Sequence, residues 1–265
     1  MNQAPPTLRP PVKLVRDTWL VFSRQILLLI RNPTWVFVGV FQPVMYLLLF
    51  APLLKPALAP IGATTNADVY RIFVPGLLIL LALFGGLFSG FGLIAELRAG
   101  IIERSRVTPV SRFALLLGRS LRDVVTMIVQ AIIITLLSLA FGLRVHLGYL
   151  LLAYLLLALI ALMTSSVSSA VALAVRSEDA LAPLMNTVSQ PVLLLSGILL
   201  PLTFAPLWLR NVAKWNPFSW AVDGTRALFN GDISNDKVWQ GLLIIVVLTV
   251  LSVVWAARKF ATSVR

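Results

Sequence analysis

The segment ELRAGIIERSRVTPVSR, residues 96–112, carries six ionisable side chains between two long apolar runs. Its carboxylates and guanidinium groups can form ion pairs, but neither this segment nor the rest of the chain shows the cluster of acid, base and nucleophile that catalysis needs. Leu97 and Ile101 are four residues apart and share one helical face, and Thr108-Pro109 ends the helix. A short helix docking on a protein surface and a solvated turn with basic residues fit this composition equally well.

Composition excludes several kinds of site and partner. The chain has no cysteine, so disulfides, thiol catalysis and thiolate metal sites are excluded. Its single histidine is His146. The net charge of +12 comes from basic residues scattered between apolar runs, which argues against a nucleic-acid partner. Apolar residues make up 59% and charged residues 12%, the latter about half the roughly 25% of ordinary globular domains. These values indicate a membrane protein.

Six apolar runs are long enough to cross a bilayer, which takes about 20 helical residues. Backbone groups must be paired in lipid, so each run is expected to be a helix. The predicted spans are 34–54, 72–95, 114–141, 148–175, 181–201 and 238–257. The sequence therefore predicts an all-α polytopic membrane protein in which residues 1–265 form a single transmembrane domain, with a six-helix core over 34–257. The proline-rich residues 1–11 lack signal-peptide features and are expected to be a disordered tail.

Residues 12–31 are predicted to form an interfacial amphipathic helix. Lys13, Asp17, Arg24 and Arg31 are spaced by four, seven and seven residues and line one face, while apolar residues cover much of the rest. Such a helix lies in the membrane interface with its basic side towards headgroups and water. An extension of the first span is the alternative, but Asn32-Pro33 favours a break.

The distribution of basic residues predicts the orientation. With these spans, 15 of the 22 Lys and Arg residues fall on one side. The positive-inside rule makes that side cytoplasmic. Both termini are therefore expected in the cytoplasm of a multi-pass cell-membrane protein, with 55–71, 142–147 and 202–237 facing outward.

The charged segment resembles the cytoplasmic coupling segment of the ATP-binding-cassette (ABC) type-2 exporter permeases, which typically show Glu, Gly and Glu before a Thr-Pro-x-Ser-Arg ending. The matching residues are Glu96, Gly100, Glu103, Thr108, Pro109, Ser111 and Arg112. Residues 31–50 resemble the family's first span, and residues 193–228 resemble its fifth span and outer region. The likeness covers nearly the whole chain and is strongest to permeases of daunorubicin-type drug-resistance exporters.

The resemblance implies a transport subunit, not an enzyme, that works with two copies of a separate ABC ATPase subunit. It also implies a second permease; a homodimer is expected, and a paralogous partner remains the alternative. The sequence contains no G-x-x-x-x-G-K-[ST] phosphate loop, so ATP and Mg are expected on the partner, with no cofactor or metal on this chain. The residues expected to couple to the ATPase are Glu96, Gly100, Ile101, Ile102, Glu103, Arg104, Arg106, Thr108 and Pro109.

The first, second and fifth spans border the pathway in the resembled family. Gln42 and Tyr46 are four residues apart, as are Asn186 and Gln190, so each pair shares a helical face. The candidate cargo-facing residues are Gln42, Tyr46, Phe84, Phe88, Asn186 and Gln190. Interhelical hydrogen bonding and ordinary packing are the alternative for each of them.

Other polar and small residues within the spans favour packing. Gly86 and Gly90 form a G-x-x-x-G that permits close helix approach, either within the chain or at a dimer seam or the pathway. Arg119, Arg122 and Asp123 are expected near the cytoplasmic end of the third span. No ionisable residue is then expected at mid-span, which argues against a proton-driven antiporter.

The sequence favours outward transport of a hydrophobic or amphiphilic, drug-like or lipid compound from the cytoplasm or the inner leaflet. Export of a lipid-linked glycan or oligosaccharide is the alternative within transport. A non-transporting membrane scaffold or immunity protein is an alternative of another class.

Overall fold

The structure, a computed structural model, describes residues 10–61, 65–100 and 111–263, which contain helices and no strand. The first part comprises α1 (Pro10–Arg31), α2 (Thr34–Leu58), the short 3-10 helix η1 (Ala59–Ile61), α3 (Asn66–Leu87) and α4 (Ser89–Arg98). The second part comprises α6 (Arg112–Ala140), α7 (Leu147–Val175), α8 (Glu178–Leu195), η2 (Leu202–Phe204), α9 (Leu207–Ala213), α10 (Pro217–Phe229) and α11 (Asp236–Ser263).

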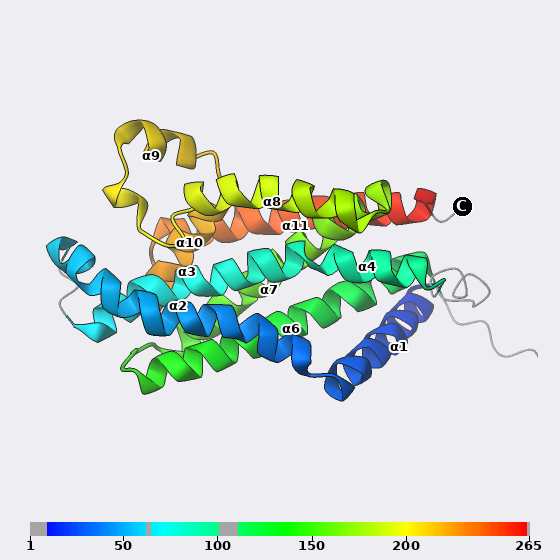
Figure 1. Ribbon diagram of the computed structural model, residues 1–265, viewed down its shortest axis with the longest axis horizontal. Helices are drawn as coiled ribbons and strands as arrows, with labels where there is room; N and C mark the ends of the chain where they lie inside the picture. The colour runs from blue at the N-terminus through cyan, green and yellow to red at the C-terminus, as the bar shows by residue number, and fades with distance from the viewer. Residues whose placement is uncertain (1–9, 62–64, 101–110, 264–265) are drawn as a thin grey trace, which may run out of the picture.

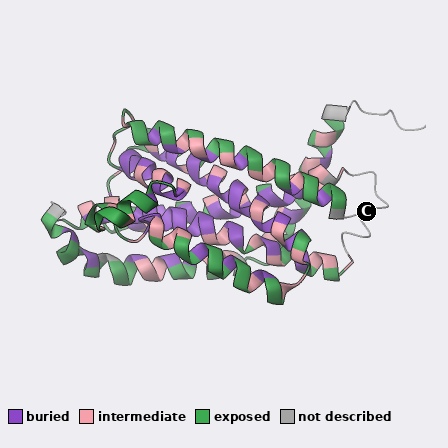
Figure 2. Ribbon diagram, turned by 90° about the horizontal axis from the view of Figure 1, so that it is seen from above, coloured by how far each residue is buried: buried purple, intermediate pink, exposed green. Residues whose placement is uncertain are grey.

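Helix α7 occupies the centre of the bundle, where it packs against α3, α4, α6, α10 and α11 (Figure 1). Buried residues concentrate on the inner helices, and the outer helices are exposed along their length (Figure 2). Many of these exposed side chains are large and apolar, such as Phe37, Leu136 and Leu243. A soluble monomer rarely exposes so much apolar surface, so this outer surface fits a hydrocarbon surrounding.

Four helical stretches of the described residues are long and apolar enough to cross a membrane: Asn66–Arg98, Phe113–Ala140, Leu147–Val175 and Asp236–Thr262. Helices α1 and α2 give a fifth candidate only as a pair, bent by 69°. The predicted count of six spans is therefore not confirmed.

The difference from six spans lies in the first and fifth predicted spans. The first corresponds to α2, a 25-residue apolar helix that counts as a candidate span only as part of the bent pair with α1. The fifth corresponds to α8, which begins at Glu178, contains Pro183 and Pro191, and ends at Leu195, before residue 201. Helix α8 carries acidic residues in its first turn and stops at Leu195. Its apolar stretch is therefore shorter than the predicted span 181–201.

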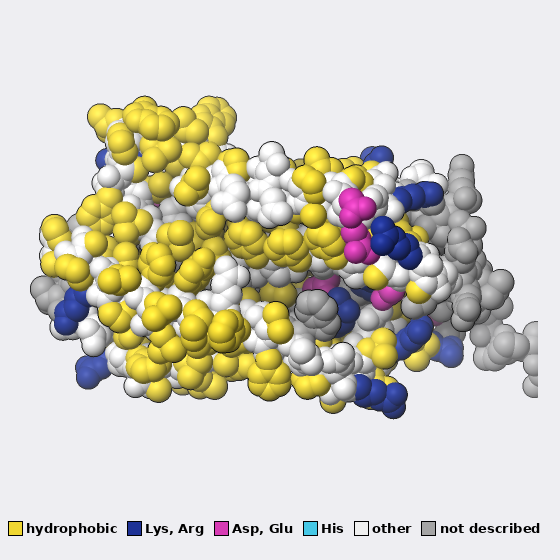
Figure 3. All heavy atoms as spheres, in the orientation of Figure 1, with side chains coloured by type: hydrophobic (Ala, Val, Ile, Leu, Met, Phe, Trp, Pro, Cys, Tyr) yellow, Lys and Arg dark blue, Asp and Glu magenta, His cyan; other side chains and the backbone are white. Residues whose placement is uncertain are grey.

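The bundle has two ends that differ in composition. At the first, called the 101–110 end, α4 ends and α6 begins, and α1 packs on α6 (Figure 1, right). At the second, called the α10 end, lie η1, α9 and α10 (Figure 1, left). Lys and Arg side chains gather at the 101–110 end in Figure 3, whereas the middle of this face is mostly hydrophobic.

Candidate functional site

The predicted coupling segment is described only at its edges. Helix α4 ends at Arg98, and Gly100 follows with φ of 66°, a left-handed conformation that glycine adopts without strain. On the other side, the Ser111 hydroxyl caps α6 by accepting from the Ala114 amide at 3.1 Å. The remaining predicted coupling residues lie outside the described residues: Ile101, Ile102, Glu103, Arg104, Arg106, Thr108 and Pro109.

Glu96, predicted to contact the ATPase, is bonded within its own chain. Its carboxylate forms an ion pair with Arg119 of α6. The same carboxylate accepts a hydrogen bond from Gln25 Nε2 of α1 at 3.3 Å. The Arg119 side chain is 8% exposed and that of Glu96 is 24% exposed. Glu96 therefore ties the last turn of α4 to both α1 and α6.

The bonding continues along α6 into the bundle. Arg122 Nη1 donates to Gln25 Oε1 at 3.4 Å, and Arg122 Nη2 donates to Asp123 Oδ1 at 2.5 Å. The Ser165 hydroxyl of α7 donates to Asp123 Oδ2 at 2.8 Å. Two guanidinium groups thus balance two carboxylates. We call this set the α6 network: Gln25, Glu96, Arg119, Arg122, Asp123 and Ser165.

Asp123 is the innermost of the three ionisable residues that are expected near the cytoplasmic end of the third span. It lies in the half of α6 (Arg112–Ala140) that begins at Arg112, and it is buried. Its partner Ser165 lies near the middle of α7. A carboxylate is tolerated at this depth because Arg122 and Ser165 satisfy its oxygens.

Helix α1 also contacts the other flank of the 101–110 segment. The Ser111 backbone N–H donates to Asp17 Oδ2 at 3.2 Å. Asp17 is buried, whereas Lys13, Arg24 and Arg31 are exposed. The prediction that Asp17 shares an outward basic face is therefore wrong. Its carboxylate points to α6 and accepts a hydrogen bond from the Ser111 amide.

The six predicted cargo-facing residues lie on α2, on α3 and the residue following it, and on α8, with α3 between the other two helices (Figure 1). Gln42 Nε2 donates to the Tyr46 hydroxyl at 3.5 Å. The rings of Phe84 and Phe88 stack with their centroids 6.1 Å apart. Asn186 and Gln190 are exposed on α8, as are Gln42 and Phe88 on their own elements. Gln42 thus pairs with Tyr46 and Phe84 with Phe88, whereas Tyr46 and Phe84 are also partly buried against the core.

Gly86 and Gly90 face α7 of the same chain. A Cβ on Gly86 would overlap the Thr164 hydroxyl, and a Cβ on Gly90 would lie 2.5 Å from Ser168 Oγ. The Ser168 hydroxyl accepts from the Gly90 amide at 3.0 Å and donates to the Leu87 carbonyl. It thereby satisfies backbone groups at the break between α3 and α4. The close approach that the G-x-x-x-G permits is here an approach within the chain.

Arg226, at the α10 end, has partners that the sequence did not indicate. Asp223 lies one turn before it on α10, but Asp223 Oδ2 forms an ion pair with Lys237 Nζ at 2.7 Å. Arg226 Nε donates to the Ile72 carbonyl of α3 at 3.0 Å. Its Nη2 donates to the carbonyls of Gly197 at 2.8 Å and Ile198 at 3.3 Å. Both belong to the turn that follows α8.

The surroundings of Arg226 explain this bonding. A Cβ on Gly76 of α3 would overlap the Ile198 carbonyl, so the turn after α8 lies directly on α3. Helix α8 ends there, which leaves carbonyl oxygens without helical donors. Burial lowers the pKa of the Arg226 guanidinium to about 10, so it stays protonated at neutral pH and supplies the missing donors.

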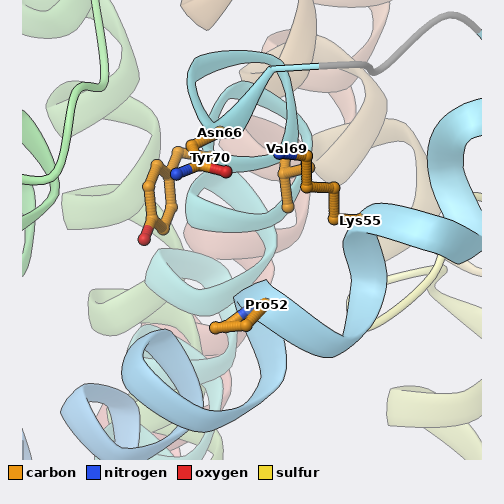
Figure 4. A pocket seen from close by; sticks show the side chains of 5 residues that line it. All are labelled: Pro52, Lys55, Asn66, Val69 and Tyr70. Atoms are coloured by element: carbon orange, nitrogen blue, oxygen red, sulfur yellow. The ribbon is translucent and has the colours of Figure 1, made fainter.

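A cavity of about 140 Å³ lies at the α10 end, between α2 and the start of α3 (Figure 4). Its lining residues are Pro52, Lys55, Asn66, Val69 and Tyr70. None of the predicted pathway residues lines it. Among the described residues, no three His, Asp or Glu side chains gather in a way that could hold a metal ion.

Comparison with known proteins places this architecture in a family. The chain is similar to the putative transport permease ycf38 of Pyropia yezoensis, with 28% identity over 220 residues, 82% of this chain and 75% of the relative. It is 25% identical over 194 residues to the daunorubicin resistance ABC transporter permease protein DrrB1 of Streptomyces coeruleorubidus, covering 72% of this chain and 67% of the relative.

A further similarity is to the probable multidrug ABC transporter permease YbhR of Escherichia coli K12, with 23% identity over 189 residues, 69% of this chain and 50% of the relative. Residues 16–230 match the family described as ABC-2 type transporter. That range begins within α1 and ends just after α10, so it contains the α6 network, the six predicted cargo-facing residues and Arg226. The chain belongs to the ABC-2 type transporter family.

Proposed function

We propose that the chain is the permease subunit of an ATP-driven exporter that moves a hydrophobic or amphiphilic compound, drug-like or lipid, out of the cytoplasm or the inner leaflet. The family match over residues 16–230 carries this proposal. Two of the similar proteins are named as drug-resistance or multidrug permeases, which supports this cargo class. ATP and Mg bind a separate ATPase subunit, because the sequence has no phosphate loop.

The cargo path runs along the face formed by α2, α3 and α8. This face combines aromatic rings, among them Phe84 and Phe88, with neutral amides such as Gln42, Asn186 and Gln190. Such a surface suits a compound with an apolar body and a few polar groups, because pockets for small molecules are mostly apolar with a few oriented polar groups.

A second copy of the permease covers the exposed side of this face, as a homodimer. Large apolar side chains such as Phe41 and Val188 are exposed beside the amides. In the membrane, α2 and α8 complete six spans with α3–α4, α6, α7 and α11, and α1 lies in the interface. Both termini and the 101–110 end face the cytoplasm of a cell membrane, because most Lys and Arg residues lie on that side.

The 101–110 segment docks on the ATPase, one ATPase subunit for each permease. Glu103, Arg104 and Arg106 provide polar contacts, and Ile101 and Ile102 provide apolar ones. The α6 network supports this role from behind. Through Glu96 it fixes the end of α4 to α1 and α6, so movement of the docked segment passes to three helices.

The proposal is tested by purifying the tagged chain from its native membranes and assaying vanadate-sensitive ATP hydrolysis. An ATPase is expected to co-purify in equal amount and to be lost with Glu103→Lys, because charge reversal breaks the docking contact. Asp236→Lys, the same acid-to-base change on an exposed residue of α11 at the α10 end, is the matched control and should retain the ATPase. A chain that inserts normally but purifies without hydrolysis would favour the scaffold or immunity interpretation.

A further inference from the structure

Helix α1 presents three distinct faces. One face packs on α6 and buries Asp17 and Gln25. A second face exposes large apolar side chains, with Val15 at 70%, Trp19 at 64% and Ile30 at 68% exposure. At 3.6 residues per turn, Lys13, Arg24 and Arg31 form a stripe between these two faces. All three are exposed, as is Arg16.

The charge on the outward side of α1 is entirely basic. Asp17 is the only acidic residue between Pro10 and Arg31, and it is buried against α6. Four exposed cations beside exposed Trp and aliphatic side chains match the chemistry of an anionic bilayer surface. There, phosphate groups meet the cations and the upper acyl chains meet the apolar face.

Continuity with the bundle favours lipid over an acidic protein surface as the occupant. Helix α1 leads through Asn32-Pro33 into α2. The first turns of α2 expose Phe37, Val38 and Phe41, so the apolar surface of α1 continues onto a helix of the bundle. A protein docked on α1 would leave this shared apolar surface partly uncovered, whereas a bilayer covers it throughout.

The buried face of α1 holds both flanks of the 101–110 segment. Gln25 donates to Glu96, near the end of α4, at 3.3 Å. Asp17 accepts from the Ser111 amide, just before α6, at 3.2 Å. A displacement of α1 against the bundle therefore moves both attachment points of the segment together.

We propose that α1 binds anionic phospholipid headgroups of the adjoining leaflet, and that this binding sets the position of the 101–110 segment through Gln25 and Asp17. The first part stands on the structure of this chain alone. The second part rests on the proposed function, because its readout is the hydrolysis of ATP by a partner docked on that segment.

The lipid-binding part is tested with the permease alone. Because the chain lacks cysteine, Leu27→Cys gives a single labelling position on the exposed apolar face of α1 for an environment-sensitive fluorophore. In nanodiscs, its emission is followed as phosphatidylglycerol replaces phosphatidylcholine. We expect a saturable change in emission. Lys13→Gln with Arg24→Gln should weaken the lipid preference by about fivefold for each charge removed.

Arg258→Gln with Lys259→Gln is the matched control, since it removes one Lys and one Arg that are exposed on α11. It should leave the midpoint of the phosphatidylglycerol titration unchanged. An emission that ignores phosphatidylglycerol, or an equal effect of the two double variants, would overturn lipid recognition by α1.

The coupling part is tested by measuring ATP hydrolysis of the complex against the phosphatidylglycerol fraction. Hydrolysis should depend on this fraction in the parent chain and lose the dependence in Gln25→Ala with Asp17→Ala. The α1 fluorophore should still respond to lipid in that variant, which shows that α1 is folded. Lipid-dependent hydrolysis that persists in the variant would overturn the coupling.

Two further outcomes separate this inference from the proposed function. If no ATPase associates with the chain, the proposed function fails, and the fluorophore titration alone decides lipid binding. If Lys13→Gln with Arg24→Gln releases the ATPase while the fluorophore keeps its lipid response, the basic stripe is an ATPase contact and the lipid proposal is overturned.

Discussion

At the 101–110 end of the bundle, buried Arg119 meets a carboxylate from another helix, whereas at the α10 end buried Arg226 donates to three backbone carbonyl oxygens. Side chains of opposite charge can exchange partners while the helices that carry them shift. An arginine bonded to carbonyls of α3 and of the turn after α8 instead fixes two backbones against each other. We infer that the first end is built to rearrange and the second to hold its shape.

The largest expected effect comes from removing the cation at the α10 end. Arg226→Leu removes the donor from the Gly197 and Ile198 carbonyls, which lie outside any helix, and each unsatisfied buried group costs about 1–3 kcal/mol. We expect a loss of roughly 3–5 kcal/mol in the free energy of unfolding, measured by SDS titration in mixed micelles. Arg226→Lys keeps the charge but lacks the planar set of donors, so it should fall between Leu and the parent chain.

A loss below about 1 kcal/mol for Arg226→Leu would show that the turn after α8 does not depend on this residue. Asp223→Asn is a control on the same helix. It loses the ion pair between Asp223 and Lys237, whose two side chains are partly exposed. The free energy of unfolding should therefore change far less.

The second prediction concerns the paired charge at the 101–110 end. Glu96→Gln leaves the Arg119 guanidinium, with its side chain 8% exposed, without its ion-pair partner. Breaking a buried pair costs about 3–5 kcal/mol, and the partial exposure of Glu96 places the expected loss at roughly 2–3 kcal/mol. The double variant Glu96→Gln with Arg119→Gln should recover part of that loss.

Recovery in the double variant tests the contrast between Arg119 and Arg226. Both members of a side-chain pair can be removed by mutation, whereas the backbone carbonyls that bind Arg226 cannot. A double-mutant cycle measures the recovery directly. If the double variant loses as much free energy of unfolding as the two single variants lose together, Arg119 and Glu96 do not act as a pair, and the contrast with Arg226 fails.

The contrast between these two arginines also shows where sequence reasoning stops. Apolar run length is local information, so the long apolar helices α3–α4, α6, α7 and α11 could be predicted. The ABC type-2 motif is a pattern of residue types, so the family could be recognised from Glu96, Gly100 and the residues that follow. The fifth predicted span was less secure, because a hydropathy window does not register that α8 ends at Leu195.

The partners of Arg226 could not be predicted, because backbone carbonyls have no residue-type signature. The Ile72 carbonyl lies 154 residues away in the sequence. Gln25 was missed for a related reason. It is a polar residue on a basic helix, and its partner Glu96 lies 71 residues further along the chain. Only the packing of α1 on α6, beside the end of α4, brings them together.

The third prediction tests whether α3 and α7 form a common axis between the two ends. Gly86→Ala places a methyl group against the Thr164 hydroxyl and the Ser165 amide. Overpacking of this kind costs about 1–3 kcal/mol, measured by the same titration. Gly148→Ala is the control, because a Cβ there meets nothing within 4 Å.

Crosslinking shows whether Gly86 has a different role. If Gly86→Ala left stability unchanged but abolished a crosslinked dimer, Gly86 would belong to a seam between two copies rather than to the α3–α7 contact. The two ends would then have no rigid connection through this part of α3.

The smallest effect is expected for the ion pair between Arg98 Nη1 and Glu178 Oε1, 3.2 Å apart, which joins the end of α4 to the start of α8. Its side chains are 56% and 39% exposed, and exposed pairs contribute about 0–1 kcal/mol. Arg98→Gln should therefore change the free energy of unfolding by less than about 0.5 kcal/mol.

Arg98 and Arg119 both lie at the 101–110 end, so a comparison of the two differs in burial and not in position along the bundle. A loss for Arg98→Gln as large as that for Glu96→Gln would mean that burial is not what makes the α6 network strong. The rigidity assigned to Arg226 would then need a cause other than its burial among carbonyl oxygens.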